Sequence, residues 1–82
     1  MSRLVESVPN VSEGRDQAVL STLAAGIRSV PGVGLLDLHS DPDHHRSVFT
    51  LAGEPAAVGT ALFTLIMQAQ RFIDLRTHHG QH

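Results

Sequence analysis

The sequence predicts a small α+β domain in which two helices cover one face of a β-sheet. Three observations support this fold class. The chain has 82 residues, which is the size of a single domain. Short runs rich in β-branched residues alternate with two longer stretches in which apolar residues recur every three or four positions. Turn-forming proline, glycine, asparagine and aspartate separate these segments.

The first half of the chain predicts a strand, a loop and a helix. Residues 4–8 form the strand, which Pro9-Asn10 closes, and residues 10–14 are a polar loop that ends at a glycine. Asp16 is suited to cap the helix that follows. Its apolar positions are Val19, Leu20, Leu23, Ala24, Ile27 and Val30, and Pro31-Gly32 ends it.

The second half predicts two strands that pair as a hairpin, followed by another helix. Residues 33–38 form one strand with imperfect alternation, residues 41–43 form a turn, and residues 47–52 form the next strand. Pro55 fits the first position of the second helix. This helix is expected to run to about Leu75, with apolar residues at Val58, Ala61, Leu62, Leu65, Ile66, Ala69, Phe72 and Ile73.

The resulting order is β-α-β-β-α, which is a ferredoxin-like unit that lacks its fourth strand. A right-handed crossover places the first and third strands side by side. The fourth strand would pair with the first, so its absence leaves residues 4–8 as an open edge. An open edge favours pairing with another chain, and we therefore expect a homo-oligomer formed through the first strand.

Composition excludes several classes of protein. The chain has no cysteine, so it has neither disulfides nor thiolate metal sites. No run of 18 apolar residues is present to span a membrane, and the N-terminus does not resemble a secretory signal, so we expect a cytoplasmic protein. The six arginines are scattered among eight acidic residues, for a net charge of −2, which argues against nucleic-acid binding.

Three segments are polar enough to carry chemistry: residues 8–14, residues 37–46 and residues 78–82. The last two hold all six histidines. A neutral imidazole near carboxylates and an arginine suits general-base catalysis, although the composition by itself favours exposed turn and tail histidines with ordinary titration. The plain structural interpretation is turn formation for Asp37, Asp41 and Asp43, and loop capping for Asn10 and Ser12.

The histidines also raise the question of a metal site. His78 and His82 are four residues apart, the spacing of zinc ligands on one helix face. Gly80 between them weakens a helix, and the glutamate of an H-E-x-x-H motif is missing. His44 and His45 are adjacent and poorly placed to bind one ion together. We therefore expect no native metal site.

Three stretches of the sequence resemble the formiminotransferase family in family order. They are Leu4-Val5-Glu6-Ser7-Val8-Pro9-Asn10-Val11-Ser12-Glu13-Gly14, Asp41-Pro42-Asp43-His44-His45-Arg46-Ser47-Val48-Phe49-Thr50, and Ile73-Asp74-Leu75-Arg76 with His78-His79-Gly80-Gln81-His82. The resemblance covers the whole chain, residues 1–82, and corresponds to the N-terminal subdomain of that family. It implies transfer of a formimino group from N-formimino-L-glutamate to N5 of tetrahydrofolate, in histidine degradation and one-carbon metabolism.

The resemblance also assigns site residues. His82 occupies the second histidine of the family motif H-x-G-x-H-P-R, and would act as the general acid and base on the folate nitrogen. Arg46 would contact a carboxylate of glutamate or folate in bidentate fashion. Asn10 and Ser12 would line the same end of the sheet, and His39 lies near this site.

The chain departs from the family at several points. His39 stands where an acid is frequent, and His45 stands where asparagine is usual. The given sequence stops before the Pro-Arg of the motif, and the family enzymes are several times longer. We therefore expect the 82 residues to be inactive alone, with either a second copy of the chain or a separately encoded remainder of the enzyme as partner. The alternative is a non-catalytic α/β module that oligomerises or binds a small ligand.

Overall fold

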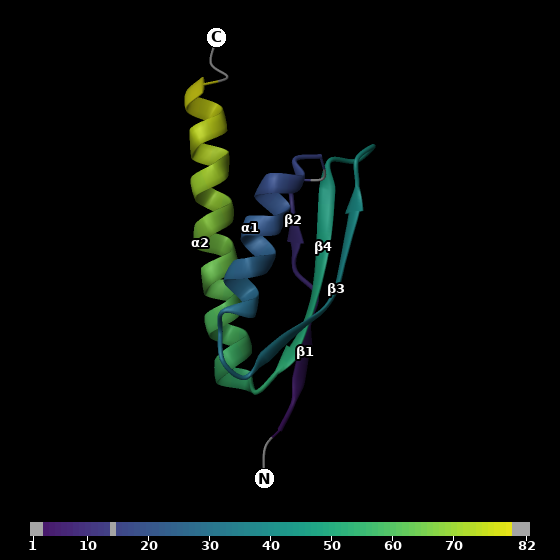
Figure 1. Ribbon diagram of the computed structural model, residues 1–82, viewed down its shortest axis with the longest axis vertical. Helices are drawn as coiled ribbons and strands as arrows, with labels where there is room; N and C mark the ends of the chain where they lie inside the picture. Colours follow the sequence, from purple (N-terminus) through teal and green to yellow (C-terminus); the bar gives the residue numbers. More distant parts are fainter. Residues whose placement is uncertain (1–2, 14, 80–82) are drawn as a thin grey trace.

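The computed structural model describes residues 3–13 and 15–79, and the side-chain surroundings as far as residue 72. It shows an α+β fold of two helices and a four-stranded antiparallel sheet, with both helices on one side of the sheet (Figure 1). Strand β4 (Arg46–Gly53) is the central strand. Strands β1 (Val5–Ser7) and β2 (Asn10–Val11) lie along one side of it, and β3 (Val33–Asp41) pairs with the other side.

Strands β1 and β2 correct the expectation for the first segment. The expected polar loop over residues 10–14 is wrong at Asn10–Val11, which pair with β4. Ser7 pairs with Leu51 and Asn10 pairs with Val48. Both pairs are three positions apart along each chain segment, so β1 and β2 keep the same register against β4. Pro9 interrupts the ladder because it has no N–H to donate, yet its carbonyl still accepts a 3.0 Å bond from the N–H of Phe49.

Helix α1 (Gln17–Arg28) begins as the sequence predicted. The Oδ1 atom of Asp16 accepts hydrogen bonds from the N–H groups of Ala18 (3.0 Å) and Val19 (3.2 Å), which makes Asp16 the N-cap. The expected apolar face is buried at Val19, Leu20, Leu23, Ala24 and Ile27. The helix ends before Pro31, and the chain turns back at Gly32, whose φ of 88° is accessible to glycine without a steric penalty.

The hairpin of β3 and β4 is longer than predicted. Strand β3 continues to Asp41 instead of ending at Leu38. Leu35 pairs with Leu51 while Asp37 pairs with Thr50, so Leu36 is the extra residue of a β-bulge. This bulge explains the imperfect alternation in the sequence. It also corrects the turn interpretation of Asp37, which lies within the strand.

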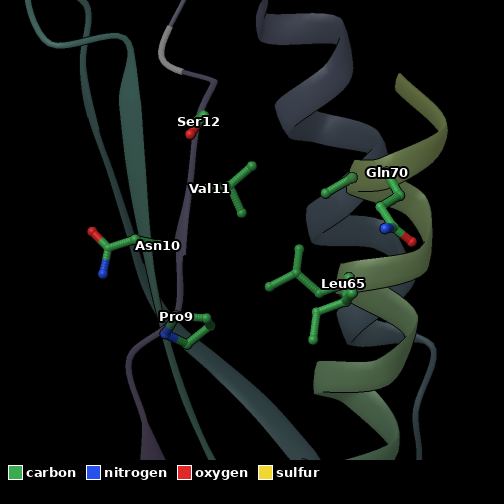
Figure 2. Close-up of a pocket in the computed structure, with 8 residues that line it drawn as sticks. Pro9, Asn10, Val11, Ser12, Leu65 and Gln70 are labelled. Atoms are coloured by element: carbon green, nitrogen blue, oxygen red, sulfur yellow. The ribbon is translucent and has the colours of Figure 1, made fainter. Parts of the chain in front are cut away.

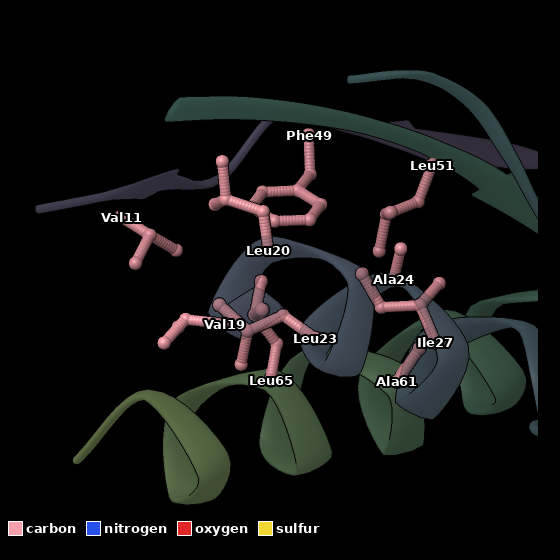
Figure 3. Packing of buried hydrophobic residues seen from close by; sticks show 10 residues of the cluster. All are labelled: Val11, Val19, Leu20, Leu23, Ala24, Ile27, Phe49, Leu51, Ala61 and Leu65. Atoms are coloured by element: carbon pink, nitrogen blue, oxygen red, sulfur yellow. The ribbon is translucent and has the colours of Figure 1, made fainter. Parts of the chain in front are cut away.

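Helix α2 (Pro55–His79) starts at Pro55 as predicted and runs four residues past the expected end at Leu75. Helix α1 lies between the sheet and part of α2, and the core fills the space that these three elements enclose (Figure 3). Phe49 and Leu51 of β4, Leu23 and Ile27 of α1, and Ala61 of α2 are fully buried there. No helix in the described part of the chain is long and apolar enough to cross a membrane.

Candidate functional site

The face of the sheet opposite the helices carries most of the residues that the sequence singled out. Along β4, Ser47, Phe49 and Leu51 are buried toward the helices, so Val48 and the exposed Arg46 point to the open face. Asn10 and His39 both pair with Val48, from β2 and β3 respectively. Residues that pair across an antiparallel sheet share a face. Asn10, Val48 and His39 therefore form one row across the open face.

A second row follows at the end of the sheet nearest the loops. Arg46 pairs with Asp41 of β3, and it lies two positions from Val48, so it shares the open face with that residue. The exposed Ser12 follows the last residue of β2, beside this row. The structure thus brings Asn10, Ser12, His39 and Arg46 together from three segments of the chain, on or next to one surface.

Two loops meet beside these rows. The loop between β2 and α1 lies next to the turn between β3 and β4 (Figure 1). The guanidinium Nε of Arg15 donates a 3.0 Å hydrogen bond to the carbonyl of Pro42. The hydroxyl of Ser47 donates to the carbonyl of Glu13 and lies 3.1 Å from the hydroxyl of Ser40. These bonds join the two polar segments that the sequence predicted to share a site.

The turn between β3 and β4 is organised by Asp41. Its Oδ1 accepts hydrogen bonds from the N–H groups of Asp43 (3.1 Å) and His44 (3.3 Å), which confirms the turn-forming role predicted for this aspartate. Its Oδ2 lies 2.6 Å from Nδ1 of His44. The side-chain hydrogen bond from His44, aided by the two backbone bonds, lowers the pKa of Asp41 from its usual value of 3.8.

Removal of the His44 ring therefore tests the electrostatics of this turn. In His44→Ala, we expect the pKa of Asp41 to rise toward its ordinary value, as measured by NMR titration of the carboxyl group. A depressed carboxyl pKa stabilises the fold above the unfolded-state pKa, and this stabilisation is lost as the pH falls through the folded-state pKa. Asp43→Ala is the matched control, because Asp43 bonds to the Asp41 carboxylate through its backbone N–H and not through its side chain. An unchanged Asp41 pKa in His44→Ala would contradict the assignment.

His45 occupies the left-handed region of backbone conformation, with φ of 53°. Asparagine adopts this conformation more readily than other residues with a side chain, apart from glycine. The turn thus gives a physical reason why asparagine would suit this position better than histidine. The Nδ1 atom of His45 lies 4.0 Å from Oε2 of Glu13, across the junction of the two loops.

Glu13 is a residue that sequence reasoning did not single out. It is 4% exposed, although it was expected to be part of a polar loop. Its Oε2 accepts hydrogen bonds from the N–H groups of Arg15 (3.1 Å) and Asp16 (2.9 Å). The sequence contains a signal for this burial. Every second residue of an extended segment faces the same side, so the inward-facing positions that include Val11 continue to Glu13. The strand pairing that reveals this alternation was not predicted.

A shallow apolar groove of about 230 Å³ lies on the other side of β2, against α2. Pro9, Val11, Leu65 and Ala69 line it, and Figure 2 shows Val11 pointing toward α2 while the Asn10 amide points away. Asn10 and Ser12 also line this groove, so it adjoins the polar rows of the open face along β2.

The predicted catalytic residue, His82, lies outside the described residues, and the side chain of His78 lies outside the part whose surroundings are described. Among the described residues, no three histidine, aspartate or glutamate side chains are grouped closely enough to hold a metal ion.

These observations define a class of protein: a small α+β domain that has a polar open sheet face and two loops connected by hydrogen bonds. The chain belongs to the formiminotransferase family: the model of the formiminotransferase domain, N-terminal subdomain, matches residues 4–82. The chain is 49% identical over its full length to the glutamate formimidoyltransferase of Streptococcus pyogenes serotype M1, covering 27% of that protein. It is 40% identical to the formimidoyltransferase-cyclodeaminase of Sus scrofa, covering 15% of it. A glutamate formimidoyltransferase of Thermoplasma acidophilum is 42% identical over 79 residues, 26% of its length. The chain thus spans about a quarter or less of the length of these relatives.

Proposed function

We propose that this chain supplies one part of a site that transfers the formimino group from N-formimino-L-glutamate to N5 of tetrahydrofolate, its co-substrate. The observation that carries the proposal is the gathering of Asn10, Ser12, His39 and Arg46 on or beside the open sheet face. The resemblance to the family points to these residues independently of the strand pairing. Membership of the formiminotransferase family supports the same reaction.

The substrates match the polar chemistry of this face. Both carry glutamate carboxylates, and Arg46 is an exposed guanidinium able to bind one of them through two parallel hydrogen bonds. The amide of Asn10, the hydroxyl of Ser12 and the ring of His39 supply further hydrogen-bonding groups. During transfer, N5 of the folate loses a proton and the departing glutamate nitrogen gains one. We propose that His82 carries this proton as general base and then general acid.

The chain alone is proposed to lack transferase activity. It spans 27% of its streptococcal relative and 15% of its porcine relative, so most of each relative's length has no counterpart here. Catalysis requires groups to be held to within about 0.5 Å of their working positions. We propose that a remainder of the enzyme, downstream or separately encoded, completes the site, and that this work is done in the cytoplasm.

Arg46→Ala is the experiment that tests the proposed binding role. We expect the affinity of the chain for tetrahydrofolate or N-formimino-L-glutamate, measured by calorimetry, to fall about 10- to 100-fold, since a hydrogen-bonded ion pair contributes roughly 1.5–3 kcal/mol. Arg71→Ala, which removes an exposed arginine of α2, is the matched control. Absence of any binding by the unmodified chain at millimolar ligand would refute a binding site on this chain.

The free edge of the sheet favours a second candidate, an oligomerising module. The fold then corresponds to a ferredoxin-like unit whose fourth-strand position, beside β1 and β2, is taken by a second copy of the chain. The bond from Phe49 to Pro9 shows that Pro9 directs its carbonyl at β4. In an antiparallel ladder the neighbouring residues, Val8 and Asn10, direct their backbone groups away from β4, toward the free edge. Val8 is 50% exposed, and Phe63 and Ile66 of α2 are also exposed.

Sedimentation tests this candidate. A homo-oligomer formed through β1 and β2 predicts a concentration-dependent mass for the chain that Val8→Lys shifts to monomer, because a charge at the edge opposes strand addition. Leu36→Lys, at an exposed apolar position on β3 at the opposite edge, is the control. A monomer at all concentrations would refute the oligomer. The free edge of β1 and β2 would then be proposed to pair with a remainder of the enzyme.

A further inference from the structure

Glu13 is a buried carboxylate to which the proposed reaction gives no role. It and Ser47 are the buried polar residues among those whose surroundings the structure describes. Burial of a carboxylate costs free energy unless hydrogen bonds compensate for the lost water. A residue of this kind in a loop beside a candidate site therefore needs a physical explanation.

The carboxylate of Glu13 folds the loop back on itself. Its Oε2 accepts from the N–H groups of Arg15 at 3.1 Å and of Asp16 at 2.9 Å. Asp16 is the N-cap of α1, so the carboxylate lies close to the positive end of the helix dipole. These two bonds connect the Glu13 side chain to the residues that lead into α1.

The backbone of Glu13 makes a second connection, to β4. Its carbonyl accepts from the hydroxyl of Ser47, and its N–H donates a 2.8 Å bond to the carbonyl of Val11. Ser47 in turn contacts the hydroxyl of Ser40 on β3 at 3.1 Å. One residue therefore connects β2, the entry to α1 and the paired strands of the hairpin.

The neighbours of these anchors are two proposed substrate-binding residues. Ser12 directly precedes Glu13 in the chain, and Arg46 directly precedes Ser47. Glu13 and Ser47 point into the buried interior, while Ser12 and Arg46 are exposed. A shift of the Glu13 anchor would move Ser12 relative to Arg46 without touching either side chain.

We propose that Glu13 is a positioning residue, whose buried carboxylate holds Ser12 beside Arg46 so that the two bind one substrate carboxylate. This inference rests on the proposed function, because it assumes that Ser12 and Arg46 bind that group. We assign the hold on the loop to the acceptor capacity of Glu13 for the N–H groups of Arg15 and Asp16, and not to its charge or to its 4.0 Å approach to His45.

Two variants separate the acceptor from the charge. Glu13→Gln keeps a carbonyl oxygen for the N–H groups of Arg15 and Asp16, whereas Glu13→Ala leaves both without that acceptor. We expect Glu13→Ala to weaken binding of tetrahydrofolate or N-formimino-L-glutamate at least tenfold in calorimetry, and Glu13→Gln to stay within about threefold of the unmodified chain. Glu6→Ala, which removes an exposed carboxylate from β1, is the control.

Amide hydrogen exchange supplies a readout that needs no ligand. In Glu13→Ala the amides of Arg15 and Asp16 should exchange about tenfold faster, while core amides such as that of Phe49 keep their protection. Cross-relaxation between Ser12 and Arg46 protons should change in Glu13→Ala and return in Glu13→Gln. The core amides also show whether the variant is folded. If Glu13→Ala fails to fold, Ser47→Ala, which removes only the hydrogen bond to the Glu13 carbonyl, takes its place.

The outcomes distinguish this inference from the proposed function. Equal affinity in all variants, or unchanged exchange at Arg15 and Asp16, would overturn the role of Glu13. Equal weakening in Glu13→Gln and Glu13→Ala would show that charge matters and would also overturn it. If the unmodified chain binds neither ligand, the proposed function fails, whereas altered Ser12 and Arg46 geometry in Glu13→Ala still supports the positioning role.

Discussion

Phe49→Ala is expected to lower the free energy of unfolding by about 3–5 kcal/mol, as measured by urea denaturation followed by circular dichroism. Phe49 is fully buried on the central strand, where its ring packs between the sheet and α1 (Figure 3). Its removal loses the transfer free energy of the ring and leaves a cavity that the flanking strands prevent from closing.

The same substitution on the surface provides the control. Phe63 of α2 is 65% exposed, so Phe63→Ala should change the stability by no more than about 0.5 kcal/mol. A domain of this size has a total stability of only about 4–12 kcal/mol, by the usual contribution per residue. Phe49→Ala should therefore remove a large share of the total stability, and equal stabilities of the two variants would contradict the described core.

Features that depend on nearby residues could be predicted from the sequence. Asp16 caps α1 through two N–H groups within three positions along the chain, and Pro55 begins α2 because its missing N–H has no partner in a first turn. The apolar spacing of α1 also depends only on the helix period. These predictions were correct because no distant part of the chain alters the contacts involved.

Features of the strands depend on pairing and could not be predicted in the same way. Pro9 ends a strand in most sequence contexts, yet here its carbonyl still bonds to Phe49, 40 positions further on, and β2 continues the register. The bulge at Leu36 depends on how β3 fits β4. Neither the bond nor the bulge leaves a local signature strong enough to identify it.

In the candidate site too, the sequence predicted the features set by nearby residues but not those set by strand pairing. The sequence identified the polar segments and, through a family resemblance, the residues Asn10, Ser12, His39 and Arg46. That Asn10 and His39 form one row follows from their common partner, Val48, which only the sheet register reveals. Glu13 was missed because the alternation that turns it inward comes from the pairing of β2 with β4, whose residues are more than 30 positions apart in the chain.

The proposed chemistry at His82 predicts the largest effect on rate. A chimera in which residues 1–82 replace the aligned segment of the streptococcal relative, to which they are 49% identical, supplies the rest of that relative's length. We expect this chimera to transfer the formimino group to tetrahydrofolate. His82→Ala in the chimera should lower kcat by a factor of about 10²–10⁴, because it removes the group proposed to carry the proton between the two nitrogens.

His44→Ala in the same chimera is the matched control, since His44 is an exposed turn residue bonded to Asp41. It should alter kcat by less than about threefold. A base that acts only on the transferred proton changes kcat more than KM, whereas a residue that binds both ground state and transition state changes KM. His82→Ala with normal kcat would remove the proton-transfer role from this residue, and an inactive chimera with native folding would show that these 82 residues cannot replace the corresponding segment of the relative.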